Sequence, residues 1–206
     1  MEIDTVTNRV MEIFSTYGVR TVSMDFIAQN IPIRKRELLA MAKNKEGLIL
    51  HIFNYRKKLA ENLYVHITKE TTNAIDTLLK MSTYIYKSQH EFKPMLDFEF
   101  KKYYPDLYSN YQQSCEKEFT SMIRENIECG ICEGMYRQDL NSDITTHLYL
   151  EKIRMLQTQM SQTEMNWKPH KIFTEALINH IRGISTITGI NYFESKKHTI
   201  QHLLDD

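Results

Sequence analysis

The chain has 206 residues, and its 26 Lys and Arg balance its 26 Asp and Glu, so the formal net charge is zero. This balance excludes a global electrostatic field that would draw the whole protein to nucleic acid or to a membrane. Hydrophobic residues make up 42% of the chain, which is enough for a sizeable core. The three cysteines argue against a disulfide framework and indicate a reducing compartment.

The N-terminal region predicts a helix and no targeting segment. Met-Glu-Ile-Asp at the start is acidic and lacks the apolar run of a signal peptide, and no apolar run in the chain approaches the ~20 residues that span a bilayer. We therefore expect a cytoplasmic protein. A helix is predicted near 5–17, with Val6, Val10, Ile13 and Phe14 on one face, and Gly18 is expected to end it.

Residues 23–48 predict two short helices joined by a tight turn, followed by the start of another helix. Ser23 suits an N-cap, and Asn30-Ile-Pro32 breaks the first helix because the residue before a proline avoids the α region. Pro32 then suits the first position of the second helix, which continues with Arg34, Lys35 and Arg36. Three cations near a helix N-terminus oppose its dipole, so an external anion would account for them better than local stability does. The pattern is typical of a DNA-binding helix-turn-helix, although a basic triplet can also be a solvated surface.

Local charge agrees with a DNA-facing segment. Between Arg34 and Lys58 the chain carries eight Lys or Arg and two Glu, a net charge of +6. A basic patch of this kind provides the electrostatic part of DNA binding.

The segments Asn8 to Phe14, Tyr17-Gly18, Ser23 to Ala28 and Lys45 to Leu48 together resemble the TetR family of transcriptional regulators. The resemblance implies a three-helix headpiece, with the second short helix as recognition helix. It also implies phosphate contacts from Ser23 and Lys45 beside those expected from Arg34, Lys35 and Arg36. A homodimer, an operator in double-stranded DNA and a small-molecule effector are the partners that the family implies.

Three positions depart from the family pattern. Pro32 stands where the family usually has glycine, Arg34 where it has a capping serine, and Leu39-Ala-Met-Ala42 where it has an aromatic-rich end. Those aromatic side chains normally help to contact the DNA backbone. The resemblance implies a ligand-responsive, DNA-binding repressor, and this is the first hypothesis. The departures give weight to an alternative, in which a helical dimer of this fold has lost operator binding and acts as a ligand sensor or protein-interaction module.

The remainder of the chain also follows helical periodicity. Helices are predicted near 45–67, 71–91, 95–104, 105–129, 144–160, 170–189 and 191–203, and no strand-like alternation occurs. The predicted fold is all-α with about nine helices. We expect a headpiece at 1–47 and a larger domain for effector binding and dimerisation at 48–206. Ala176 and Gly183, seven residues apart, would let the helices near 144–160 and 170–189 approach their mates in a four-helix dimer interface.

A cluster of aromatic residues between 92 and 111 is the most unusual composition of the chain. About half of these side chains are expected to be core, and the others could line a pocket for a small apolar or aromatic effector. The candidate ligand-binding residues are Tyr84, Met95, Phe98, Tyr103, Tyr111 and Met122.

The sequence gives no support for a catalytic, metal or cofactor site. Cys129-Gly-Ile-Cys132 lacks a second ligand pair, and His198 and His202 lack a third ligand. No phosphate-binding glycine loop, nucleophile elbow or His-Glu-x-x-His motif is present. We therefore expect a protein that is not an enzyme.

Overall fold

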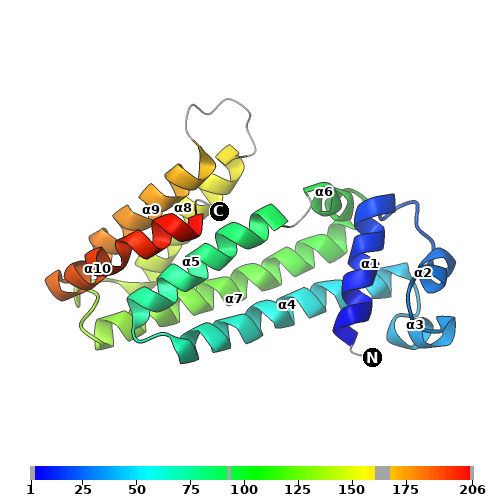
Figure 1. Ribbon diagram of the computed structural model, residues 1–206, viewed down its shortest axis with the longest axis horizontal. Coiled ribbons are helices and arrows are strands. Elements are labelled where there is room, and N and C mark those ends of the chain that lie inside the picture. The colour runs from blue at the N-terminus through cyan, green and yellow to red at the C-terminus, as the bar shows by residue number, and fades with distance from the viewer. Residues whose placement is uncertain (1–2, 92–93, 161–167, 205–206) are drawn as a thin grey trace. The chain divides into compact units, whose positions relative to one another are not determined.

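The computed structural model describes residues 3–91, 94–160 and 168–204. The described residues form helices and no strand, so the all-α prediction is confirmed. The helices, labelled in Figure 1, are α1 (Ile3–Tyr17), α2 (Met24–Asn30), α3 (Lys35–Met41), α4 (Lys45–Glu70), α5 (Ala74–Glu91), α6 (Pro94–Tyr103), α7 (Pro105–Cys132), α8 (Ser142–Met160), α9 (Pro169–Ile184) and α10 (Ile187–Leu204). No helix in the described ranges has both the length and the apolar character needed to cross a bilayer.

The chain divides into two compact units. One contains Met1–Leu63 and Ser88–Glu116, and the other contains Tyr64–Lys87 and Lys117–Asp206. The long helices α4 and α7 each contribute to both units.

The core of the first unit is built from apolar residues at helical spacing. Val10, Phe14, Ile27, Leu38 and Phe53 are buried in one cluster. Phe100 on α6 belongs to the same cluster, with its ring edge-to-face against Phe53 at a centroid distance of 5.0 Å. The helix-turn-helix segment therefore shares its core with α4 and α6.

In the second unit, α9 contacts both α8 and α10 (Figure 1). The connection between α9 and α10 is fixed by the loop after α7, because the Arg137 N–H donates to the Ile184 carbonyl and the Thr186 N–H donates to the Met135 carbonyl, both at 2.9 Å. The predicted helix over 170–189 was therefore too long: α9 ends at Ile184, and Gly189 lies inside α10.

Candidate nucleic-acid interface and ligand pocket

Two short helices present the candidate DNA-binding surface. Ser23 precedes α2, and its hydroxyl accepts a hydrogen bond from the Phe26 N–H at 3.1 Å. Arg34 is the N-cap of α3, and its backbone N–H donates to the Glu37 carboxylate at 2.8 Å. Glu37 thus stabilises a helix start after Arg34, so Pro32 lies in the connecting turn and not at the first helical position that the sequence predicted.

The exposed face of α3 combines positive charge with small apolar side chains. Lys35, Arg36, Leu39 and Ala40 are exposed, whereas Leu38 is fully buried. Because α-helical residues repeat every 3.6 positions, the four exposed residues share one side of α3. That side could present a guanidinium to phosphates or guanine, and methyl groups to thymine.

The basic side chains differ in how free they are. The Lys35 ammonium pairs with Asp25 on α2 at 2.5 Å, with both side chains more than half exposed. The Lys45 ammonium donates to the Arg20 carbonyl at 3.0 Å, and burial lowers the pKa of Lys45 while the Glu99 charge opposes that shift. Within the described residues, the Arg36 side chain makes no hydrogen bond or ion pair. Arg36 is therefore the cation best able to meet an external anion without breaking an existing contact.

Glu99 on α6 contributes to the positioning of this surface. Its carboxylate accepts a hydrogen bond from the Val19 N–H in the turn between α1 and α2. Gly18 ends α1 with φ +84°, as the sequence predicted, and a Cβ atom there would lie 3.0 Å from the same carboxylate. Sequence reasoning missed this role because Glu99 lies eighty positions away from its partner.

The six residues predicted for ligand binding are divided between the two units. Tyr111 stacks on Phe53 with ring centroids 4.3 Å apart, and Tyr103 faces the Arg20 guanidinium. Phe98 and Tyr84 are 57% and 42% exposed, and Met122 is half-buried. The Met95 side chain lies outside the described residues. The other five do not line the pocket described next.

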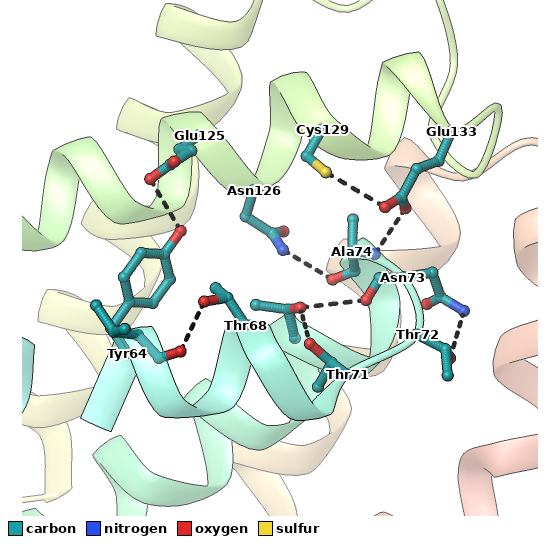
Figure 2. Close-up of a pocket in the computed structure, with 12 residues that line it drawn as sticks. Tyr64, Thr68, Thr71, Thr72, Asn73, Ala74, Glu125, Asn126, Cys129 and Glu133 are labelled. Atoms are coloured by element: carbon teal, nitrogen blue, oxygen red, sulfur yellow. Dashed lines mark hydrogen bonds between the residues drawn. The ribbon is translucent and has the colours of Figure 1, made fainter. Parts of the chain in front are cut away.

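A pocket of about 470 Å³ lies entirely within the second unit, between the end of α4, the start of α5 and the second half of α7. Figure 2 shows side chains of α7 pointing toward α4 and the α4–α5 turn. The lining residues are Tyr64, Val65, Thr68, Thr71, Thr72, Asn73, Ala74, Thr77, Glu125, Asn126, Cys129 and Glu133.

Hydrogen bonds between the three helices hold the pocket open. The Asn126 amide donates to the Ala74 carbonyl at 2.8 Å, and the Glu133 carboxylate accepts from the Ala74 N–H at 2.8 Å (Figure 2). The Tyr64 hydroxyl donates to the Glu125 carboxylate at 3.1 Å. These bonds join α7 and Glu133 to α4 at Tyr64 and to the start of α5 at Ala74, so the walls have a defined spacing.

The pocket combines apolar surface with polar groups, and it carries negative charge. Glu125 and Glu133 line it, while no Lys, Arg or His does so among the described residues. Burial, and then the hydrogen bond to Glu133, raise the pKa of the Cys129 thiol to about 11, so the thiol stays protonated at neutral pH. Burial and the Glu125 charge also raise the pKa of Tyr64. The four threonines between 68 and 77 are the one sequence feature that could have indicated the wall opposite α7. The sequence alone, however, does not show that they face α7.

Comparison with known proteins identifies the fold. No protein-family model and no curated protein sequence matches the chain. Solved structures do match: the fatty acid degradation regulator FadR from Bacillus halodurans has a TM-score of 0.67 at 12% identity, over 89% of this chain and 100% of that one. A TetR-family transcriptional regulator from Cytophaga hutchinsonii has a TM-score of 0.63 at 12% identity, covering 89% of this chain and 94% of that one. A transcriptional regulator from Saccharomonospora viridis in complex with choline has a TM-score of 0.64 at 14% identity, over 89% and 97% of the two chains. The chain therefore has the fold of the TetR-family transcriptional regulators.

Proposed function

We propose that this protein is a ligand-responsive, DNA-binding transcriptional regulator, acting as a homodimeric repressor. The observation that carries the proposal is the helix-turn-helix, in which α3 presents an exposed face and its Arg36 side chain has no partner among the described residues. The fold shared with transcriptional regulators supports the same conclusion. Residues 1–47 would serve as the DNA-binding headpiece and residues 48–206 as the domain for effector binding and dimerisation.

The five candidate DNA contacts would play different roles. Arg36 would reach phosphate or a guanine edge from the exposed face of α3. Ser23 and Arg34 precede α2 and α3, where backbone N–H groups favour a phosphate. Lys35 and Lys45 would have to exchange their present partners, Asp25 and the Arg20 carbonyl, for a phosphate.

The need to break these contacts before DNA can bind supports the second candidate function. In it, a dimer of this fold senses a ligand or binds a protein and no longer binds an operator. Among the four lysine and arginine candidates, Lys35 and Lys45 already have partners within the chain. Leu39 and Ala40 also occupy the part of α3 where an aromatic end would supply backbone contacts.

Dimerisation would use α8. Ile144, Leu148 and Met155 are 59%, 63% and 58% exposed, and their spacing places them on one side of the helix. On α9, by contrast, Leu177 and Ile184 are buried within the single chain. The α8 stripe, defined as Ile144, Leu148 and Met155, is therefore the apolar surface that a second copy would cover.

A salt series tests DNA binding. Binding to DNA from upstream of the protein's own gene, and to scrambled DNA of equal length, would be measured for the wild type and for the Lys35→Ala, Arg36→Ala, Lys45→Ala triple variant. Each phosphate contact contributes roughly −0.9 to the slope of log K against log salt, so a dimer should lose up to about five units of slope. Lys69→Ala, an exposed lysine of the second unit, is the matched control and should leave the slope unchanged.

Arg36→Ala alone separates the two kinds of contact. If Arg36 reads guanine, its loss should cost roughly 1–3 kcal/mol per half-site and relax preference at one base. If wild type and triple variant give the same weak curve on both DNAs, operator binding is absent and the second candidate function replaces the first.

A further inference from the structure

One wall of the pocket, formed by α7 and the residue that follows it, carries a carboxylate at each end. Glu125 and Glu133 are eight residues apart, which corresponds to roughly 12 Å along the helix axis. Asn126 and Cys129 lie between them, and Figure 2 shows all four side chains along α7 and its C-terminal end, just beyond which Glu133 lies. The facing wall presents threonine hydroxyls from α4, the turn and α5.

These two charges have no cationic partner in the described residues of the pocket. The Arg124 guanidinium pairs with Asp143 at 2.7 Å, and the Lys80 ammonium pairs with Glu70 at 3.4 Å, so neither cation is committed to Glu125 or Glu133. An anionic ligand would be repelled by both carboxylates, whereas a cationic ligand would gain from both.

The acceptors that remain suit ammonium groups. A carboxylate offers about four lone-pair sites, of which Glu125 uses one for the Tyr64 hydroxyl. Glu133 uses two, for the Ala74 N–H and the Cys129 thiol. Threonine hydroxyls add further acceptors, and an ammonium group donates up to three hydrogen bonds.

We propose that this pocket binds a linear diamine or polyamine, with one ammonium group at Glu125, a second toward Glu133, and the methylene chain along Val65, Ala74 and the Tyr64 ring. A volume of about 470 Å³ is within the range of small-molecule sites. The proposal rests on the proposed function only in naming this ligand as the effector. A diamine differs from the apolar or aromatic effector that the aromatic cluster predicted. The reason is that two carboxylates line the pocket, and they favour a cationic ligand.

Calorimetric titration of the full chain with 1,8-diaminooctane, whose length is close to the separation of the two carboxylates, tests the proposal. The neutral 1,8-octanediol is the matched probe, and it should bind at least about tenfold more weakly because it cannot form the ion pairs. Glu125→Gln keeps an acceptor for Tyr64 and removes the charge, so it should weaken diamine binding by about tenfold or more. Glu133→Gln should weaken it less, since that carboxylate is already partly occupied.

Glu128→Gln is the matched control, because Glu128 is exposed on α7 outside the pocket. Its carboxylate accepts a hydrogen bond from the Ser142 hydroxyl at 3.4 Å, which a glutamine carbonyl can also accept. Equal losses in Glu125→Gln and Glu128→Gln would reduce the effect to general surface charge and overturn the proposal. Equal binding of diamine and diol, or no diamine binding at millimolar concentration, would also overturn it.

A parallel DNA-binding measurement keeps this proposal separate from the proposed function. Diamine binding that follows the Glu125→Gln pattern but leaves DNA affinity unchanged would support the ligand class and refute the effector role. Sequence-specific DNA binding without any diamine binding would refute the ligand class and leave the regulator proposal in place.

Discussion

A buried histidine makes the stability of the second unit depend on pH. His180 on α9 is 8% exposed, and its ring stacks on Tyr149 of α8 with centroids 4.2 Å apart. Burial, and then the nearby Lys152 charge, lower the pKa of His180 to about 3. No partner for its Nε2 atom is present in the described residues.

The sign of the effect follows from where the proton binds. The folded chain keeps His180 neutral down to about pH 3, while the unfolded chain binds a proton below its ordinary pKa of 6.5. Stability should therefore fall as the pH drops below 6.5, by about 2 kcal/mol between pH 7 and pH 5. Urea unfolding at both pH values should show this loss in the wild type and a smaller loss in His180→Phe, which keeps a stacked ring. His66→Gln, at an exposed position, is the control. Identical losses in wild type and His180→Phe would show that His180 does not titrate in this way.

Residues such as His180 and Glu99 mark the limit of sequence reasoning at this scale. A lone histidine or glutamate on a predicted helix gives no sign of the partner that determines its role. The partner of His180 is Tyr149 and the partner of Glu99 is Val19, and only the tertiary fold brings each pair together. Ser23 and Gly18 were predictable because their hydrogen bonds and backbone conformation are local to a helix end.

At the scale of elements, Gly130 allows α7 and the following loop to close on each other. A Cβ atom at Gly130 would lie 2.1 Å from the Tyr136 ring, which is fully buried and whose hydroxyl donates to Asn126 at 3.3 Å. We expect Gly130→Ala to lower the free energy of unfolding by roughly 1–3 kcal/mol, because the ring must move within a packed core.

A double-mutant cycle identifies the cause. In a Tyr136→Ala background the clash is removed, so Gly130→Ala should become neutral or stabilise the helix by up to about 1 kcal/mol. Urea unfolding of all four proteins gives the coupling free energy. A cost of Gly130→Ala that is the same in both backgrounds would mean that the ring contact is not responsible.

The same region explains why one helix boundary was mispredicted. The periodicity over 170–189 continues through Ser185 and Thr186, and Gly183 just before them lies within α9, so it does not itself mark the break. The break is instead stabilised by hydrogen bonds to Met135 and Arg137, about fifty residues earlier in the chain. Helix ends that are set by local residues, such as the end of α1 at Gly18, could be predicted. The end of α9 could not, because it depends on the loop after α7.

At the scale of the whole molecule, the sequence predicted the all-α fold and the helix-turn-helix but not the cavity. The helix-turn-helix is local, so its turn residues and apolar spacing lie within one short stretch. The pocket joins α4, α5 and α7, and its two walls come from segments about fifty positions apart in the chain. The composition of the aromatic cluster predicted a pocket there, yet Phe100 is fully buried and Tyr111 is stacked on Phe53 in the core of the first unit.

Assembly provides the last prediction. If a second copy covers the α8 stripe, the Leu148→Asp, Met155→Asp double variant should be monomeric in sedimentation velocity at concentrations where the wild type is dimeric. Both side chains are more than half exposed in the single chain, so helical content by circular dichroism should stay unchanged. Leu177→Asp would not be informative, because Leu177 is buried and a charge there would unfold the chain.

Ile187→Asp is the matched control for this experiment. Ile187 is an apolar residue of α10 that is 80% exposed and lies outside the α8 stripe, so adding a charge there should leave the dimer intact. A dimer that survives the double variant, or one that Ile187→Asp disrupts equally, would refute α8 as the interface. Monomerisation by the double variant alone would place the two-fold axis beside α8. The same variant should then bind a single half-site of DNA, since the second headpiece is no longer tethered, and lose about half of the salt slope of the wild type.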